Sequence, residues 1–87
     1  NKQNEFNQTP FFIACGCRNL EIVKVLIKNE RTELNKPNNY NQTPFWTACR
    51  WGYLEIVKVL IKDERIDINK PDNYNMTPFY IACAHAY

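Results

Sequence analysis

The sequence predicts an all-α solenoid, in which antiparallel helix pairs are stacked in a row and joined by hairpin-like loops. The string Asn-Gln-Thr-Pro-Phe at 7–11 recurs at 41–45 and, as Asn-Met-Thr-Pro-Phe, at 75–79, with a spacing of 34 residues each time. Residues 7–40 and 41–74 are identical at 23 of 34 positions. A fixed period of this length is typical of repeat proteins, whose units bury their apolar faces only against their neighbours.

The repeats divide the 87-residue chain into four segments. Residues 1–6 correspond to the end of a unit, so we expect the remnant of a preceding hairpin there. Residues 7–40 and 41–74 are two full repeats, and 75–87 supplies the first helix of a truncated third. We therefore expect one repeat segment over the whole chain, belonging to a longer array.

Each unit is expected to begin with a short helix, such as the one predicted over 44–51. Thr43 is a good N-cap, because its hydroxyl can accept a hydrogen bond from a free amide of the first turn. Pro44 occupies the first helical position, where a missing N–H costs little. Phe45 begins an apolar face at helical spacing. Gly52 follows as a stop that can adopt positive φ.

A second helix is predicted over 54–62, antiparallel to the first because the two are joined by a tight turn. Val59 and Ile56 are expected to face the neighbouring unit, and Glu55 to pair with Lys58 at i, i+3. The sequence also predicts a buried apolar stripe at helical spacing. Its members are Leu54, Val57, Leu60 and Ile61.

A loop is predicted after the second helix. Pro71 is incompatible with a helix interior, and the Asn and Asp residues within 69–75 supply turn chemistry. This connection can fold back as a β-hairpin-like finger before the next Thr-Pro pair. The Asn that precedes each Gln/Met-Thr-Pro (Asn7, Asn41 and Asn75) fits a left-handed turn conformation better than a glycosylation acceptor.

These stretches together resemble the ankyrin repeat across the whole chain. The residues that carry the resemblance are Thr43-Pro44-Phe45-Trp46-Thr47-Ala48, then Gly52, then Leu54-Glu55-Ile56-Val57-Lys58-Val59-Leu60-Ile61, then Asp67-Ile68-Asn69.

Three departures from the family pattern stand out. The His of the family's Thr-Pro-Leu-His stretch is replaced by Phe12, Trp46 and Tyr80. We expect this aromatic column to pack between units rather than to form a binding ladder, with polar partners for Trp46 and Tyr80. Arg18 stands where the other full unit has a turn glycine, which strains the turn. Each unit also carries one extra residue in the loop at 30–33 and 64–67.

Composition and charge argue against a nucleic-acid-binding or membrane-inserted protein. The net charge is only +2, with basic and acidic residues interleaved, so a nucleic-acid surface is not expected. No apolar run reaches the length of a membrane span, so we expect no membrane insertion. Three of the four cysteines occupy one repeat position and are expected to be reduced, buried thiols. They favour an intracellular, cytoplasmic location.

No catalytic, cofactor or metal site is expected. The chain has no serine and a single histidine, His85, whose i, i+2 spacing from Cys83 places the two side chains on different sides of a helix. Two isolated glycines cannot form a phosphate-binding loop. Cysteines in successive units lie too far apart to share one zinc ion. The sequence therefore predicts no enzyme.

The resemblance implies a protein–protein interaction module that binds a peptide or protein through its concave face and hairpin tips. The positions with matching roles in the middle unit are Asn39, Tyr40, Gln42, Arg50 and Trp51; in the next unit they are Asn73, Tyr74, Met76, Ala84 and His85; in the first they are Glu5, Phe6, Gln8, Gly16 and Cys17. Tyr, Trp and Arg are enriched at interaction hot spots.

Alternatives to this interpretation remain open. Tyr40 and Tyr74 could merely pack against adjacent hairpins. The segment could be a structural spacer within a longer array, or a regulatory arm of a larger enzyme. The partner-binding hypothesis places specificity where the repeats differ, above all at 16–19, 50–53 and 84–87.

Overall fold

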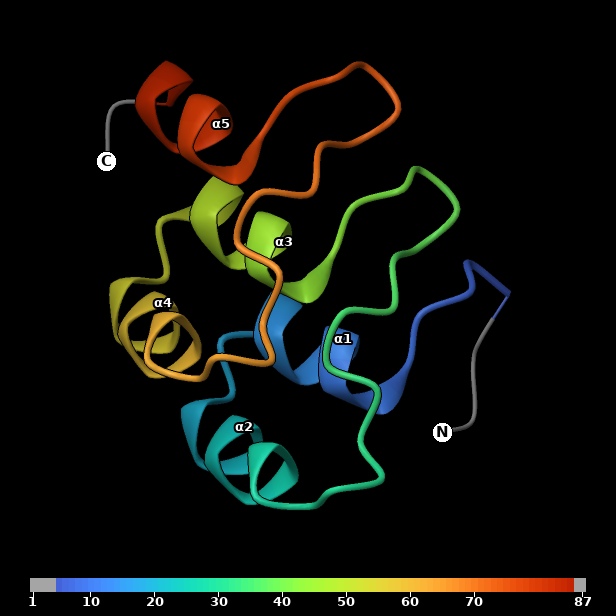
Figure 1. Ribbon diagram of the computed structural model, residues 1–87, viewed down its shortest axis with the longest axis vertical. Helices are drawn as coiled ribbons and strands as arrows, with labels where there is room; N and C mark the ends of the chain where they lie inside the picture. Colours follow the sequence, from blue (N-terminus) through green and yellow to red (C-terminus); the bar gives the residue numbers. More distant parts are fainter. Residues whose placement is uncertain (1–4, 86–87) are drawn as a thin grey trace.

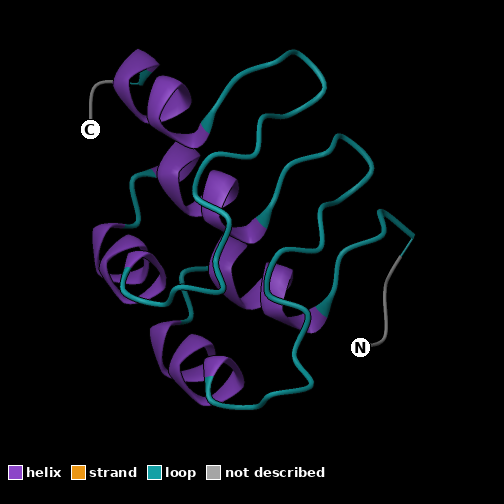
Figure 2. Cartoon of the chain, viewed as in Figure 1, coloured by secondary structure: helices purple, strands orange, loops and turns teal. Residues whose placement is uncertain are grey.

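The computed structural model describes residues 5–85, which form five helices and no strand. The helices are α1 (Pro10–Gly16), α2 (Leu20–Ile27), α3 (Pro44–Trp51), α4 (Leu54–Ile61) and α5 (Pro78–Ala84). Helices α1, α3 and α5 form one layer, α2 and α4 form a second, and the long loops project from the opposite side of the first layer (Figures 1 and 2). The all-α stack of helix pairs is confirmed. Residues 1–4 of the expected hairpin remnant, and 86–87, lie outside the described residues.

The first helix of every unit begins as predicted. The hydroxyls of Thr9, Thr43 and Thr77 accept hydrogen bonds from the backbone N–H three residues later, at 3.0–3.1 Å. A proline follows each threonine at the start of the helix. The predicted helix over 44–51 matches α3. The cap and the proline together fix the residue at which each of these helices begins.

Left-handed backbone conformations occur at the predicted places. Asn7, Asn41 and Asn75 have φ between 63° and 65°, and Gly52 has φ 69°. Arg18 holds the same conformation, with φ 60°, although it carries a Cβ. For a residue other than glycine this region costs about 1–2 kcal/mol. The guanidinium of Arg18 lies 5.7 Å from the ring centroid of Tyr53, which offsets part of that cost.

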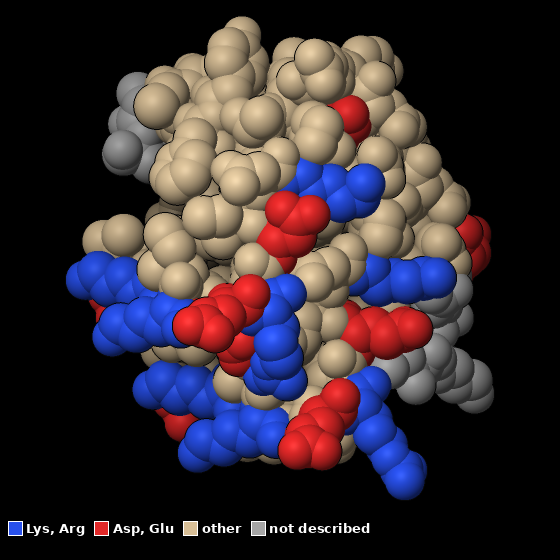
Figure 3. Space-filling model, viewed as in Figure 1, with Lys and Arg blue, Asp and Glu red and all other residues tan. Residues whose placement is uncertain are grey.

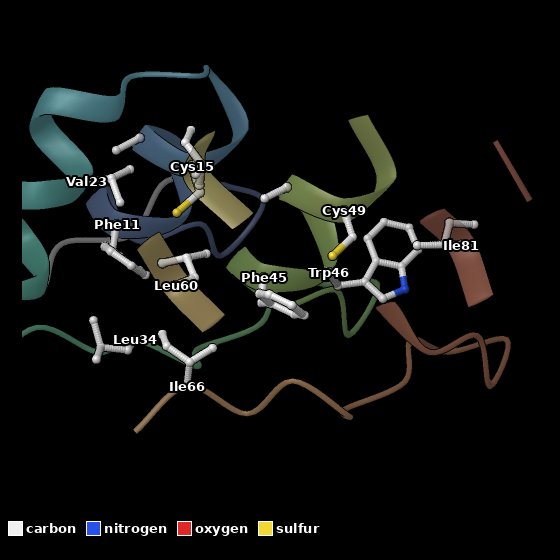
Figure 4. Close-up of a cluster of buried hydrophobic side chains, with 13 residues drawn as sticks. Phe11, Cys15, Val23, Leu34, Phe45, Trp46, Cys49, Leu60, Ile66 and Ile81 are labelled. Carbon is white, nitrogen blue, oxygen red and sulfur yellow. The ribbon is translucent and has the colours of Figure 1, made fainter. Parts of the chain in front are cut away.

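Helix α3 lies between α1 and α5, and six of its eight residues are buried. Figure 4 shows the buried side chains in one continuous row, from Val23 and Phe11 through Phe45 to Trp46 and Ile81. The core therefore runs through both units without a break. Within a unit the two helices pack against each other, and the first helix of one unit packs against the first helix of the next.

The predicted apolar stripe on the second helix is wrong in part. Leu60 is buried, but Leu54 and Ile61 are 60% and 45% exposed. Ile56 is 1% exposed, whereas its counterpart Ile22 in α2 is 44% exposed. This position therefore faces the second helix of the preceding unit. For α4 that helix is α2, whereas no described helix precedes α2 in this layer. The prediction that Ile56 faces a neighbouring unit is confirmed, and stacking rather than helical period alone sets the buried face.

The loops form hairpin-like fingers without strand pairing in the described part of the chain. Within one finger, the N–H of Asn38 donates to the carbonyl of Gln42 at 3.0 Å. Successive fingertips are also bonded to one another. The N–H of Asn39 donates to the carbonyl of Phe6 at 3.2 Å, and that of Asn73 to the carbonyl of Tyr40 at 3.1 Å. These bonds hold the fingers side by side along the stack.

Charged side chains gather over α2, α4 and the loops that follow them, and few lie over α5 and the fingers (Figure 3). On these outer helices Glu21 pairs with Lys24 at 3.9 Å, and Glu55 pairs with Lys58 at 3.6 Å, as predicted. Exposed pairs of this kind contribute only a few tenths of a kcal/mol. None of the helices within residues 5–85 is long and apolar enough to cross a membrane.

Substitutions at Arg18 and Gly52, in the turns between paired helices, should change the free energy of unfolding in opposite directions. Gly52→Ala should lower the free energy of unfolding by about 1 kcal/mol, because alanine is strained at positive φ. Arg18→Gly should raise it, by about 0.5 kcal/mol after the loss of the cation–π contact with Tyr53. Urea unfolding followed by tryptophan fluorescence measures both. Equal signs for the two variants would show that backbone strain is not what distinguishes these turns.

Candidate partner-binding groove

A cavity of about 310 Å³ lies between α1 and α3, beside two of the fingers. It has a mixed polar and apolar lining drawn from three segments of the fold. The fingers contribute Gln8, Asn38 and Gln42, α1 contributes Phe12, Ile13 and Gly16 with the adjoining Cys17, and α3 contributes Trp46, Thr47, Arg50 and Trp51. The cavity thus lies at the junction of the first and middle units, on the side of α3 that faces the fingers.

Arg50 and Trp51 form a stacked pair at one edge of the cavity. The guanidinium carbon of Arg50 lies 4.3 Å from the centroid of the Trp51 ring. Trp51 remains 50% exposed. Arg50 makes no ion pair with any residue between 5 and 85, and it is the only charged side chain that lines the cavity. Stacking on an indole holds a guanidinium in place while its N–H groups stay able to donate.

Thr47 lies at the base of the cavity, close to Gly16 of α1. A Cβ added at Gly16 would lie 3.5 Å from the Cγ2 atom of Thr47. Thr47 is 6% exposed, and its Oγ1 has no hydrogen-bond partner within the described structure. The corresponding residues of the other units are Ile13 and Ile81. The middle unit therefore has a smaller, polar side chain at a position that is aliphatic on both sides of it.

The finger side of the cavity is held by Asn38. Its Oδ1 accepts hydrogen bonds from the N–H of Tyr40 at 2.9 Å and from the N–H of Gln42 at 3.0 Å. Its Nδ2 donates to the Oε1 of Gln42 at 3.0 Å. The side chain of Gln42 is thus fixed through its oxygen, and its NH₂ group has no partner among residues 5–85. Asp72 makes the same two turn bonds in the next finger.

The predicted partner-binding residues fall into three groups. Gln42, Arg50 and Trp51 come together at the cavity. The second group lies on two fingertips and has exposed side chains; its members are Asn39, Tyr40, Asn73 and Tyr74. The third group lies away from the cavity and comprises Met76, which is half-buried against the core, and His85, which is exposed at the end of α5.

The exposure of the two fingertip tyrosines bears on the alternative that they merely pack against adjacent hairpins. Tyr40 has a described finger on each side of it and is nevertheless 53% exposed. Tyr74 is 77% exposed. It is the backbone carbonyl of Tyr40, rather than its ring, that bonds the next finger. Contact between fingers therefore leaves both tyrosine residues more than half exposed.

The aromatic column packs between units in two of its three members. Phe12 and Trp46 are 4% and 5% exposed, as expected for a core position. The indole N–H of Trp46 donates to the carbonyl of Met76 at 3.0 Å. This bond confirms the predicted polar partner for Trp46. For Tyr80 the expectation is wrong. Its ring is 58% exposed, because no described helix covers the outer face of α5.

The four cysteines also divide into buried and exposed residues. Cys15 and Cys49 are buried, and burial raises the pKa of their thiols from 9.0 to about 12 and about 11. Cys83 is exposed, so the expectation of buried thiols at the shared repeat position is wrong for it, and Cys17, outside that position, is exposed as well. Cys83 lies on the uncovered face of α5, and Cys17 is the C-cap of α1, beyond the packed face of that helix. Within residues 5–85 no three His, Cys, Asp or Glu side chains lie close enough to hold a metal ion.

Sequence reasoning missed two residues of the groove. Asn38 is not among the predicted partner-binding residues, although it makes the same Asx-type bond as its counterpart Asp72, which lies in the predicted turn stretch 69–75. Thr47 appears in the sequence-based prediction only as part of the ankyrin-like stretch 43–48. The signal for Thr47 was present, because a polar residue interrupts an isoleucine position that is repeated on both sides.

Comparison with known proteins gives one family. A family model described as ankyrin repeats (3 copies) matches residues 1–72. No curated protein matches the chain. The matched region includes the whole of the cavity described above.

Burial of two thiols and exposure of two others predicts a difference in reactivity. At pH 8, iodoacetamide should alkylate Cys17 and Cys83 in the folded protein and reach Cys15 and Cys49 only after unfolding. Peptide mass mapping of the labelled protein measures this. Rapid labelling of all four thiols without denaturant would contradict the packing of Cys15 and Cys49.

The raised pKa values also predict a dependence of stability on pH. A group whose pKa is raised on folding stabilises the fold fully below its unfolded value, here about 9.0, and this contribution is lost as pH rises toward 11–12. The free energy of unfolding should therefore fall above about pH 9. The Cys15→Ala, Cys49→Ala double variant should show a shallower fall; an identical slope would exclude these thiols as the cause.

Proposed function

Because the chain belongs to the ankyrin-repeat family, we propose that it binds a peptide or protein surface through its concave face and the tips of its fingers. Repeats of this family are generally protein–protein interaction modules without enzymatic activity. The binding surface proposed for this chain consists of the predicted residues of the middle unit and of the finger that follows it. We refer to this surface, defined by Asn39, Tyr40, Gln42, Arg50, Trp51, Asn73 and Tyr74, as the groove surface.

One observation carries the proposal: three large aromatic side chains are exposed on the groove surface. Tyr40, Trp51 and Tyr74 are between 50% and 77% exposed. Their backbones lie in segments held by hydrogen bonds, so the rings are presented from ordered positions. Aromatic side chains with few rotatable bonds lose little entropy on binding and are common interaction hot spots.

The distribution of charge supports a partner that is neither nucleic acid nor membrane. On the face shown in Figure 3, charged side chains gather over α2, α4 and the loops that follow them. Several are paired with an opposite charge there, as in Glu55 with Lys58 and Asp63 with Arg65. A phosphate backbone requires a row of unpaired cations, and the groove surface presents only Arg50. The four unpaired cysteine thiols support an intracellular, cytoplasmic setting.

Selection from a displayed library of random peptides tests the proposal. The folded chain should select peptides whose binding is lost in the Tyr40→Ala, Trp51→Ala, Tyr74→Ala triple variant. Truncation of hot-spot residues typically costs more than 1 kcal/mol each, so the affinity should fall by at least about tenfold. Fluorescence anisotropy with the selected peptides measures the change.

A matched control uses three exposed residues of the outer helices. The Lys24→Ala, Glu55→Ala, Lys58→Ala triple variant changes α2 and α4 and should bind the selected peptides as the unchanged chain does. Circular dichroism of both variants establishes that they fold. Equal binding by all three proteins, or loss only in the control, would overturn the assignment of the groove surface.

A further inference from the structure

We propose that the cavity between α1 and α3 receives an acidic side chain of an extended peptide, whose carboxylate pairs with Arg50. This inference rests on the proposed function and specifies the chemistry of the partner. The proposal concerns one anchoring contact, with Arg50 and Trp51 on one side and Gln42 on the other.

Charge is the first argument. Arg50 is the only charged side chain that lines the cavity, and it has no acidic partner among the described residues. By contrast, Arg65 is held by Asp63 at 2.6 Å, and Lys24 and Lys58 each pair within their own helix. An unpaired guanidinium in a concave site favours a ligand of opposite charge. A planar carboxylate matches its fork of N–H donors.

Preorganisation is the second argument. The guanidinium of Arg50 is stacked on Trp51 at 4.3 Å, so less conformational freedom is lost when it binds an anion. On the opposite side, the oxygen of the Gln42 amide is occupied by Asn38. The amide NH₂ of Gln42 is thereby available to a carbonyl or carboxylate oxygen of the ligand. Two donor groups therefore border the same cavity without an acceptor among residues 5–85.

Size and shape are the third argument. At about 310 Å³, the cavity is at the lower end of the range for small-molecule sites, about 300–1,000 Å³. It suits one or two side chains rather than a whole cofactor. Aromatic and aliphatic groups line it together with the donors, so the methylene carbons of a glutamate or aspartate also have apolar surface to contact.

The difference between units is the fourth argument. The position of Arg50 is occupied by Gly16 and Ala84 in the other units, and that of Thr47 by Ile13 and Ile81. The middle unit thus combines a smaller side chain at the base of the cavity with a cation at its edge. Thr47 keeps a buried Oγ1 without a hydrogen-bond partner among the described residues, which is unfavourable for stability. The isoleucines at this position in the other units have no polar side-chain atom to leave unpaired.

A double-mutant cycle between protein and peptide tests the contact. Peptides selected by the folded chain should share an Asp or Glu at one position. Replacing that residue by its amide, in the peptide, and making Arg50→Gln in the protein should each weaken binding about tenfold, as expected for a hydrogen-bonded charge pair. The two changes together should cost little more than either alone. Fluorescence anisotropy measures all four combinations.

Two further variants sharpen the test. Thr47→Ile introduces the residue found in both other units, so the fold should be kept or stabilised while the filled cavity binds the acidic peptide more weakly. Lys58→Gln removes an exposed cation from the outer face of α4 and should change nothing. Thermal unfolding establishes that each variant folds.

The outcomes separate this inference from the proposed function. Peptides that need Tyr40 and Tyr74 but show no coupling of an acidic residue to Arg50 would overturn the acidic anchor and leave the groove surface in place. Tighter binding of a phosphoserine version of the same peptide would also overturn the carboxylate assignment. Selected peptides that are indifferent to Tyr40, Trp51 and Tyr74 would overturn the proposed function itself.

Discussion

The contact between the first helices of successive units is the interaction on which this structure depends. None of the five described helices exceeds eight residues, and isolated helices of that length are not stable in water. Helix α3 is held because α1 covers one of its faces and α5 the other. Burial of one large apolar side chain contributes about 1.5–3 kcal/mol. Burial of Phe45 and Trp46, the two large apolar side chains among the six buried residues of α3, therefore accounts for its persistence better than its own hydrogen bonds do.

The same contact also fixes the positions of the fingers and of the groove between α1 and α3. The packed faces of α1, α3 and α5 hold the helices in register, and the Asn-x-Thr-Pro motif fixes the turn and the start of each helix. The fingertips are bonded to one another through backbone atoms. Side chains on the fingers and along the groove are then free to differ between units, and Arg50 and Thr47 are two places where they do.

The sequence predicted the local elements well because their determinants are local. The helix over 44–51, its threonine cap and the left-handed asparagines all follow from residue chemistry within a few positions. Burial was predicted less well. Leu54, Tyr80 and Cys83 occupy positions that are covered in other units, and they are exposed here because no described helix packs against them. The position of a residue within a repeat indicates which contacts it can make. Whether it is buried depends on whether an adjacent unit is present to make them.

The candidate groove was predictable in part, for a related reason. Gln42, Arg50 and Trp51 could be chosen from residue type and position, and the structure brings them to one cavity. Thr47 and Asn38 could not be chosen by type, because threonine and asparagine are ordinary in helices and turns. Their place in the groove follows from the approach of α1 to α3 and from side-chain bonds within one finger, which no residue type specifies.

The measurement that tests the stacking account most directly compares one substitution at two equivalent positions. Phe45 and Phe79 occupy the same place in the Thr-Pro-Phe motif, but Phe45 is 1% exposed and Phe79 is 52% exposed. Phe45→Leu should lower the free energy of unfolding by about 1 kcal/mol or more, and Phe79→Leu by less than about 0.5 kcal/mol. Equal losses at the two positions would contradict the claim that contact between units, rather than the motif itself, stabilises the fold.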